Sequence, residues 1–268
     1  MPLEGPRDSQ RPFSLGQRRA GLRIVAESQP LALCDALDAP DSLGVISSHG
    51  LLPEQLGSLC HSLARPRSAR RPLHPALPLG EQGQRLAVAT YAEKDQAVQR
   101  LCDWATQLGL SRRAVAALEQ AVDELLLNAL FDAPCDAAGV PRYVALSPRD
   151  RLAITAAPGE EAEVRFAADA RRVVVAVRDR FGALRRETIL RYFRRCALAQ
   201  QARQSPLEQK VGGSGVGLFL VLGTASELCF RLRAGRTTDV IYTLYRERPW
   251  PLRALLVDDR DDRAARPR

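Results

Sequence analysis

The sequence is poor in lysine and in aromatic residues, and it has no long apolar run. Lys94 and Lys210 are the only lysines among 39 basic residues, so arginine supplies nearly all of the positive charge behind the net +8. Aromatic residues make up 5% of the chain. Proteins that bind nucleic acid usually gather basic residues on one face, with aromatic residues between them. Because the arginines here are scattered and aromatics are scarce, we expect no nucleic-acid partner.

Motifs of metal binding, redox chemistry and targeting are also missing from the sequence. The six cysteines form no C-x-x-C pair, and no histidine stands at ligand spacing from one of them, which removes the usual zinc and dithiol motifs. No uncharged apolar run approaches the roughly 18 residues of a membrane span. The N-terminus lacks the apolar core of a secretory signal. We therefore expect a cytoplasmic protein with no membrane partner.

What is present divides the 268 residues by composition. The length and the 46% hydrophobic fraction are enough for one substantial core without disulfides. We expect a disordered tail over residues 1–21, a small α/β segment over 22–64, a Pro- and Arg-rich linker over 65–85, a main domain over 86–246 and a charged C-terminal extension over 247–268.

Apolar spacing predicts the elements of each segment. In the N-terminal segment we expect strands over 22–26 and 43–47 and helices over 30–37 and 53–63. In the main domain we expect strands over 86–90, 162–167, 172–178, 228–232 and 239–244, and helices over 93–108, 111–131, 185–198 and 218–222. This order favours an α+β fold with a mostly antiparallel sheet and helices on one face.

The first motif lies in the helix predicted over 111–131. Glu124 and Asn128 are four residues apart, so one face of the helix presents both. Both interrupt an apolar stripe, where a polar group costs free energy unless it is satisfied. An asparagine oxygen suits Mg²⁺, and a nearby glutamate suits a general base. An ordinary exposed polar pair gives the same pattern, so this motif alone leaves both interpretations open.

The second motif is a glycine-rich run directly before a predicted helix. Gly213, Gly215 and Gly217 alternate with other residues and precede the apolar stretch 218–222. Glycine allows close approach of the backbone to phosphates, and a helix N-terminus adds free N–H donors. The spacing matches neither a Rossmann nor a Walker motif. A flexible loop or a tight helix cap is the alternative.

The third and fourth motifs lie at strand ends. Asp179 ends a strand and is followed by a turn at Gly182, and a buried carboxylate there can accept a hydrogen bond from an exocyclic amine. Thr238 begins a later strand after a turn. Ordinary turns give both patterns, so each is weak by itself.

The order and spacing of the four motifs resemble the GHKL ATP-binding superfamily, which includes gyrase B, MutL, histidine-kinase catalytic domains and anti-sigma-factor serine kinases. The resemblance covers about residues 93–246, and the sequence around Asp179 looks like that of bacterial anti-sigma-factor-like proteins with a D-x-F-G-x-L motif. It implies a Bergerat-type α/β sandwich, here preceded by the small α/β segment. It also implies ATP and Mg²⁺ as cofactors.

The resemblance assigns a role to each motif residue. It implies that Glu124 is the catalytic base and that Asn128 binds Mg²⁺. Lys210, at the edge of the glycine-rich loop, would reach the γ-phosphate, with a solvated loop lysine as the alternative. The implied nucleotide-binding residues are Asp179, Gly182, Lys210, Gly213, Gly215, Gly217 and Thr238.

The sequence departs from the family at one box. The family usually has D-x-G-x-G, whereas Phe181 and Ala183 stand at its glycine positions here. Phe181 either packs beneath the adenine or alters the pocket. We therefore carry two functions: a Mg-ATP-binding regulatory protein, as an anti-sigma-like Ser/Thr protein kinase or ATPase, and a non-catalytic nucleotide-sensing module. Both imply a regulatory protein partner, and the oligomeric state, a homodimer included, stays open.

Overall fold

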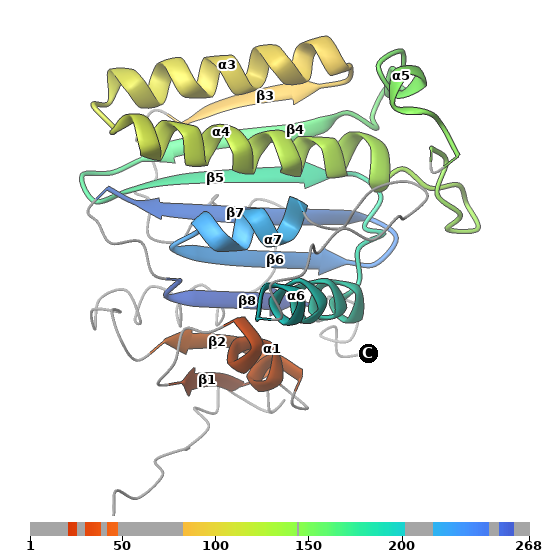
Figure 1. Cartoon of the computed structure of the whole chain (residues 1–268). Coiled ribbons are helices and arrows are strands. Elements are labelled where there is room, and N and C mark those ends of the chain that lie inside the picture. Colours follow the sequence, from red (N-terminus) through yellow and green to blue (C-terminus); the bar gives the residue numbers. More distant parts are fainter. Residues whose placement is uncertain are drawn as a thin grey trace, which may run out of the picture.

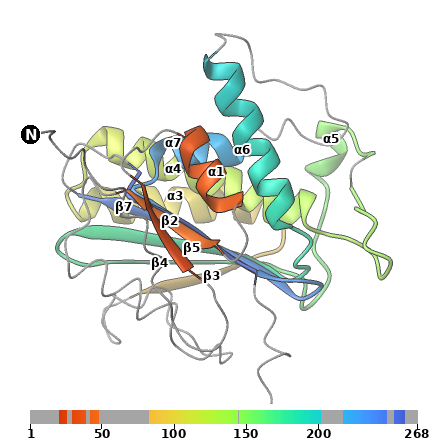
Figure 2. The same cartoon turned by 90° about the horizontal axis from the view of Figure 1, so that it is seen from below.

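The computed structural model describes residues 21–25, 30–38, 42–47, 83–143, 145–201, 217–246 and 252–259. In these residues eight strands form one mixed sheet, and the long helices lie on one of its faces (Figures 1 and 2). The expected α+β class is confirmed. The strands are β1 (Gly21–Val25), β2 (Ser42–Ser47), β3 (Gln84–Val88), β4 (Ala162–Ala168), β5 (Arg172–Asp179), β6 (Glu227–Arg233), β7 (Thr237–Tyr245) and β8 (Ala254–Asp258). The helices are α1 (Pro30–Asp38), α3 (Tyr91–Gln107), α4 (Arg112–Leu127), the π-helical turn η1 (Asn128–Asp132), α5 (Pro148–Arg151), α6 (Arg186–Gln201) and α7 (Gly217–Thr224).

The sheet has the order β1-β2-β8-β6-β7-β5-β4-β3. The five strands β3, β4, β5, β7 and β6 are antiparallel neighbours. Central β5 is rich in β-branched residues, and its Val173, Val174 and Val175 are fully buried. The register sets Asp179, the last residue of β5, directly opposite Thr238 in β7. Two motifs separated by 59 residues of sequence are thus brought together at one end of the sheet.

The C-terminal extension contains a strand, β8, that was not predicted from the sequence. It lies between β2, to which it is antiparallel, and β6, to which it is parallel. All of Ala254–Asp258 is buried. This short apolar run was hidden by the charged residues that follow it in the sequence. Because β8 joins β1 and β2 to the central strands, the N-terminal segment continues the main sheet and is not a separate unit (Figure 1).

The helices α3 and α4 cover the half of the sheet formed by β3, β4 and β5 (Figure 1). Ser111 caps α4, since its side chain accepts from the backbone N–H of Ala114. Gly109, just past the end of α3, has a left-handed φ of 76°, which suits the C-terminal cap of a helix. Thr90 differs from the expectation of a strand residue. It caps α3 in a capping box with Glu93.

Some predictions fall outside the described residues. These are the disordered tail up to residue 20, the helix over 53–63, and the linker up to residue 82. Helix α6 extends to Gln201, beyond the end at residue 198 that the sequence predicts.

Two arginines tie helix α6 to the N-terminal elements: Arg194 pairs with Asp35 and Asp38 of α1, and Arg186 makes the more buried contacts. The guanidinium of Arg186 donates to the carbonyl oxygens of Val257 at 3.0 Å, of Leu37 at 2.6 Å and of Ser42. These oxygens belong to β8, α1 and β2, and the arginine side chain is only 14% exposed. One side chain therefore joins four elements that are distant in sequence.

Replacing this arginine should weaken the whole domain. We expect Arg186→Ala to lower the free energy of unfolding by about 2–4 kcal/mol, because three carbonyl oxygens lose a charged donor. Urea unfolding followed by circular dichroism measures the loss. The control is Arg191→Ala, which removes an exposed arginine from the same helix and should cost less than 1 kcal/mol. Equal losses in the two variants would contradict this role.

Candidate functional site

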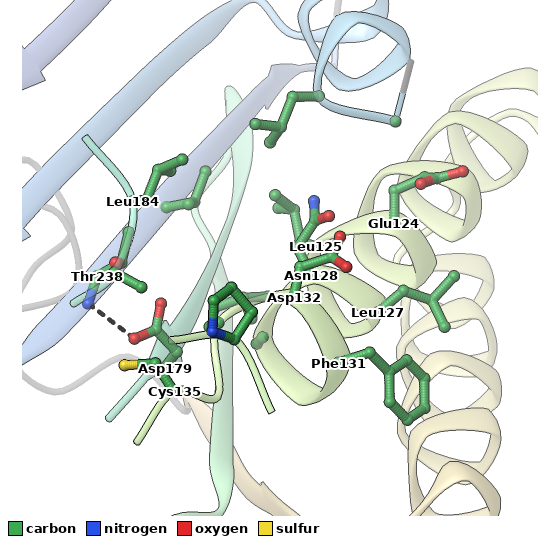
Figure 3. Close-up of a pocket in the computed structure, with 18 of the residues that line it drawn as sticks. Glu124, Leu125, Leu127, Asn128, Phe131, Asp132, Cys135, Asp179, Leu184 and Thr238 are labelled. Atoms are coloured by element: carbon green, nitrogen blue, oxygen red, sulfur yellow. Dashed lines mark hydrogen bonds between the residues drawn. The ribbon is translucent and has the colours of Figure 1, made fainter. Parts of the chain in front are cut away.

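A cavity of about 880 Å³ opens where α4 and η1 meet the ends of β5 and β7 and the start of α7. Residues of α5 and α6 complete its wall. Glu124, Asn128, Asp179, Gly217 and Thr238, all predicted from the sequence as site residues, line this one cavity. Figure 3 shows Asn128 between Glu124 on one side and Asp179 and Thr238 on the other. The structure thus brings two residues of the first motif and one residue of each other motif to a common space.

The polar face of α4 continues one turn beyond the predicted motif. Glu124, Asn128 and Asp132 follow one another at intervals of four residues and all line the cavity. The last turn is π-helical, since the N–H of Ala133 donates to the oxygen of Asn128 at 2.8 Å. Single π turns are frequent at functional sites. The side-chain nitrogen of Asn128 is inaccessible to solvent and has no hydrogen-bond partner.

Glu124 lies directly against the start of α7. A Cβ atom added to Gly217 would come within 2.0 Å of a carboxylate oxygen of Glu124. Only glycine therefore leaves the glutamate in its present position. Burial raises the pKa of Glu124, and the neighbouring carboxylates of Asp123 and Asp132 raise it further, while Lys94 opposes them.

Lys94 was not assigned to the site from the sequence. Its side chain is 2% exposed, and its ammonium group forms ion pairs with Asp123 and with Asp95, the latter at 2.9 Å. The same group lies 4.4 Å from the ring centroid of Tyr91, which lines the cavity. Burial lowers the pKa of Lys94, but hydrogen bonds to the two aspartates outweigh it, so the pKa is raised. The one sequence feature that could have pointed to Lys94 is that lysine is rare in this chain.

Asp179 is held by the backbone of its own turn and of β7. Its Oδ1 accepts from the N–H groups of Phe181 and Gly182 at 2.8 Å each and of Thr238 at 3.3 Å. The residue is 6% exposed. Burial raises the pKa of Asp179, although the backbone donors oppose the shift. The carboxylate is therefore a fixed acceptor at the inner end of the cavity.

Gly182 supports Asp179 but is absent from the cavity wall. Its φ is 60°, and an added Cβ would lie 2.1 Å from the carbonyl oxygen of Arg233 in β6. The glycine is needed because the turn packs on the backbone of the β6–β7 hairpin. Phe181 likewise lies away from the cavity wall, and its ring centroid is 5.4 Å from the guanidinium carbon of Arg142. Phe181 therefore does not form part of the cavity wall in this structure, whereas Ala183 does line the cavity.

Three predicted site residues cannot be placed, and the cavity wall has two further basic side chains. Lys210, Gly213 and Gly215 lie outside the described residues. Basic side chains reach the wall from α5, at Arg149 and Arg151. Within the described ranges no three His, Cys, Asp or Glu side chains gather to hold a metal ion. No described helix has the length and apolar character needed to cross a membrane.

Comparison with known proteins adds no relative. No protein-family model matches the chain, and no curated protein sequence matches it. The function must therefore be argued from the cavity itself.

Substitution at Gly182 tests how the Asp179 turn is built. We expect Gly182→Ala to cost more than about 3 kcal/mol of stability, since the left-handed φ costs about 1–2 kcal/mol and the Cβ would collide with backbone. Gly235→Ala is the matched control, because its φ is 65° and nothing lies within 4 Å of the added Cβ. The loss of stability in Gly235→Ala should therefore come only from the unfavourable φ. Chemical unfolding of both variants decides, and similar losses would be evidence against the close approach.

Proposed function

We propose that the protein is a regulatory protein of the GHKL type that binds Mg-ATP in this cavity. The observation that carries the proposal is the convergence of residues from all four motifs on one space. Such a nucleotide site needs four parts. They are an acid–amide pair on a helix, a buried carboxylate at a strand end, a threonine opposite that carboxylate, and a helix that begins with glycine. Chance turns and exposed polar pairs would not be expected to meet.

Each part of the nucleotide has a matching group in the cavity. Asp179 is the acceptor for the exocyclic amine of adenine. The N–H groups at the start of α7 suit phosphate oxygens, because a helix N-terminus carries free donors and a partial positive charge. The volume of about 880 Å³ lies within the usual range of small-molecule sites.

Magnesium fits the donor set through Asn128. Its amide nitrogen has no protein partner, so the protein does not fix this amide for a purely structural purpose. A single amide oxygen would leave the other positions of the ion to phosphate oxygens and water. When bound, Mg²⁺ would neutralise charge on the phosphate oxygens.

Glu124 is the group for proton transfer. Its raised pKa brings it closer to the working range of a general base. Its carboxylate lies against Gly217, where the N-terminus of α7 would hold phosphate. From there it can accept a proton from water or from a hydroxyl of a partner protein. This arrangement serves an ATPase or a Ser/Thr protein kinase.

The second candidate is a non-catalytic nucleotide-sensing module that contacts a regulatory partner. Ala183 favours it, because this side chain lines the cavity where the family pattern has glycine. The two candidates share ATP binding and differ only in the role of Glu124.

Binding is tested at the amide. We expect Asn128→Ala to abolish binding of Mg-ATP in calorimetric titration, because the metal loses its protein ligand. The control is Gln99→Ala, which removes an exposed amide from α3 and should leave binding unchanged. Titration of wild-type protein with ATP and EDTA should resemble the Asn128→Ala result. Unchanged Mg-ATP binding by that variant would sink the proposed site.

Turnover is tested at the carboxylate. We expect Glu124→Gln to reduce ATP hydrolysis or phosphoryl transfer by at least about 100-fold, the usual contribution of a general base, with Mg-ATP affinity within a few-fold of wild type. Glu119→Gln removes an exposed carboxylate from the same helix and should keep full activity. Wild-type protein that binds ATP without any turnover, or a Glu124→Gln variant as active as wild type, would instead favour the non-catalytic module.

A further inference from the structure

The wall formed by α5 brings positive charge to the cavity. The basic side chains that line it in the described residues are Arg149 and Arg151. Ser147 caps the N-terminus of this short helix, since its hydroxyl oxygen accepts from the N–H of Asp150 at 3.2 Å. Arg149 is exposed, whereas Arg151 is 18% exposed. No sequence motif pointed to either arginine.

Arg151 is incompletely satisfied by the protein. Its Nη1 lies 4.0 Å from Oδ1 of Asp132, which is beyond hydrogen-bond distance. Its Nε is inaccessible to solvent and has no hydrogen-bond partner. The side-chain nitrogen of Asn128, one helical turn before Asp132, is in the same condition. Two buried donors without protein acceptors, Asn128 at the start of η1 and Arg151 on the facing wall of the same cavity, suit a ligand rich in acceptor oxygens.

The order of groups along the cavity indicates which part of the ligand would lie next to Arg151. Glu124 marks the end at α7, and Asp132 lies eight residues further on, at the end of the π-helical turn η1. Arg151 stands beside Asp132 and therefore away from the end where the outer phosphates would lie. Asp179 holds the base on the other side (Figure 3). The position next to Arg151 falls between base and outer phosphates.

We propose that Arg151 binds the phosphate nearest the ribose, so that the site recognises nucleoside phosphates from the monophosphate upward. This proposal rests on the proposed function, because it takes the direction of the nucleotide from Asp179 and α7. In the free protein Asp132 partly balances the guanidinium charge. In the complex a phosphate oxygen would accept from Arg151 at close range, which a carboxylate 4.0 Å away does not.

The test compares adenosine with AMP, both without metal, in calorimetric titrations of the full chain. We expect the wild type to bind AMP about tenfold more tightly than adenosine. Arg151→Met should lose this gain while binding adenosine like wild type, which also shows that the variant is folded. Arg151→Lys should recover part of the gain. Arg149→Met, the control from the same helix, should keep it.

An AMP-to-adenosine ratio unchanged in Arg151→Met would overturn the inference and leave the proposed function standing. An equal loss in Arg149→Met would overturn it too, since general positive potential would then be responsible. If wild type binds neither adenosine nor ATP, the proposed function fails. In that case, titration with inorganic pyrophosphate tests whether Arg151 by itself forms a phosphate site. Binding that needs Arg151 but not Arg149 supports a phosphate site, and any other result removes it.

Discussion

The buried carboxylate of Asp179 is the constraint on which the cavity depends. At 6% exposure an ionised carboxylate is costly unless hydrogen bonds replace its water. Backbone N–H groups of Phe181 and Gly182 in its own turn, and of Thr238 in β7, supply them. To reach this geometry the turn must press on the β6–β7 hairpin, where the N–H of Gly235 donates to the oxygen of Gly182 at 3.2 Å. The turn that holds this carboxylate at the cavity therefore also joins three strands.

The alternation of side chains along the strands keeps this cavity separate from a row of charges behind it. Glu163, Arg178 and Asp239 are directly opposite one another on β4, β5 and β7, and Arg178 pairs with Asp239. Arg178 and Asp239 each stand between two residues that line the cavity, so they point to the other face of the sheet, and Glu163 lies opposite Arg178 on that face. Cross-strand pairs of opposite charge stabilise a sheet. These strands thus carry ion pairs on one face of the sheet. On the other face, Asp179 and Thr238 line the cavity.

Local sequence patterns were enough to predict the helical part of the site. They were not enough to predict which strand residues lie opposite one another. The spacing of four placed Glu124 and Asn128 on one helical face, because helix periodicity depends only on neighbours in sequence. That Asp179 lies opposite Thr238 depends on the register of β5 and β7, which no local rule gives. The strand at Ala254–Asp258 was missed because five residues among many charges carry too little signal for a composition argument. Residues that matter only through contacts across elements need the structure.

The charges on α4 explain why an anionic ligand needs more than the acidic motif. Asp123, Glu124 and Asp132 lie within nine residues, and Lys94 is the cation whose influence reaches Glu124. Because Lys94 is already engaged by two aspartates, the helix face toward the cavity stays negative. A bare triphosphate would be repelled there, and the cost grows where water is excluded. In the proposed nucleotide site, opposing charge would come from Arg151 on the facing wall, from the start of α7 and from a divalent ion at the amide between the carboxylates. Under that proposal, the acidic face would make the binding of a triphosphate depend on metal.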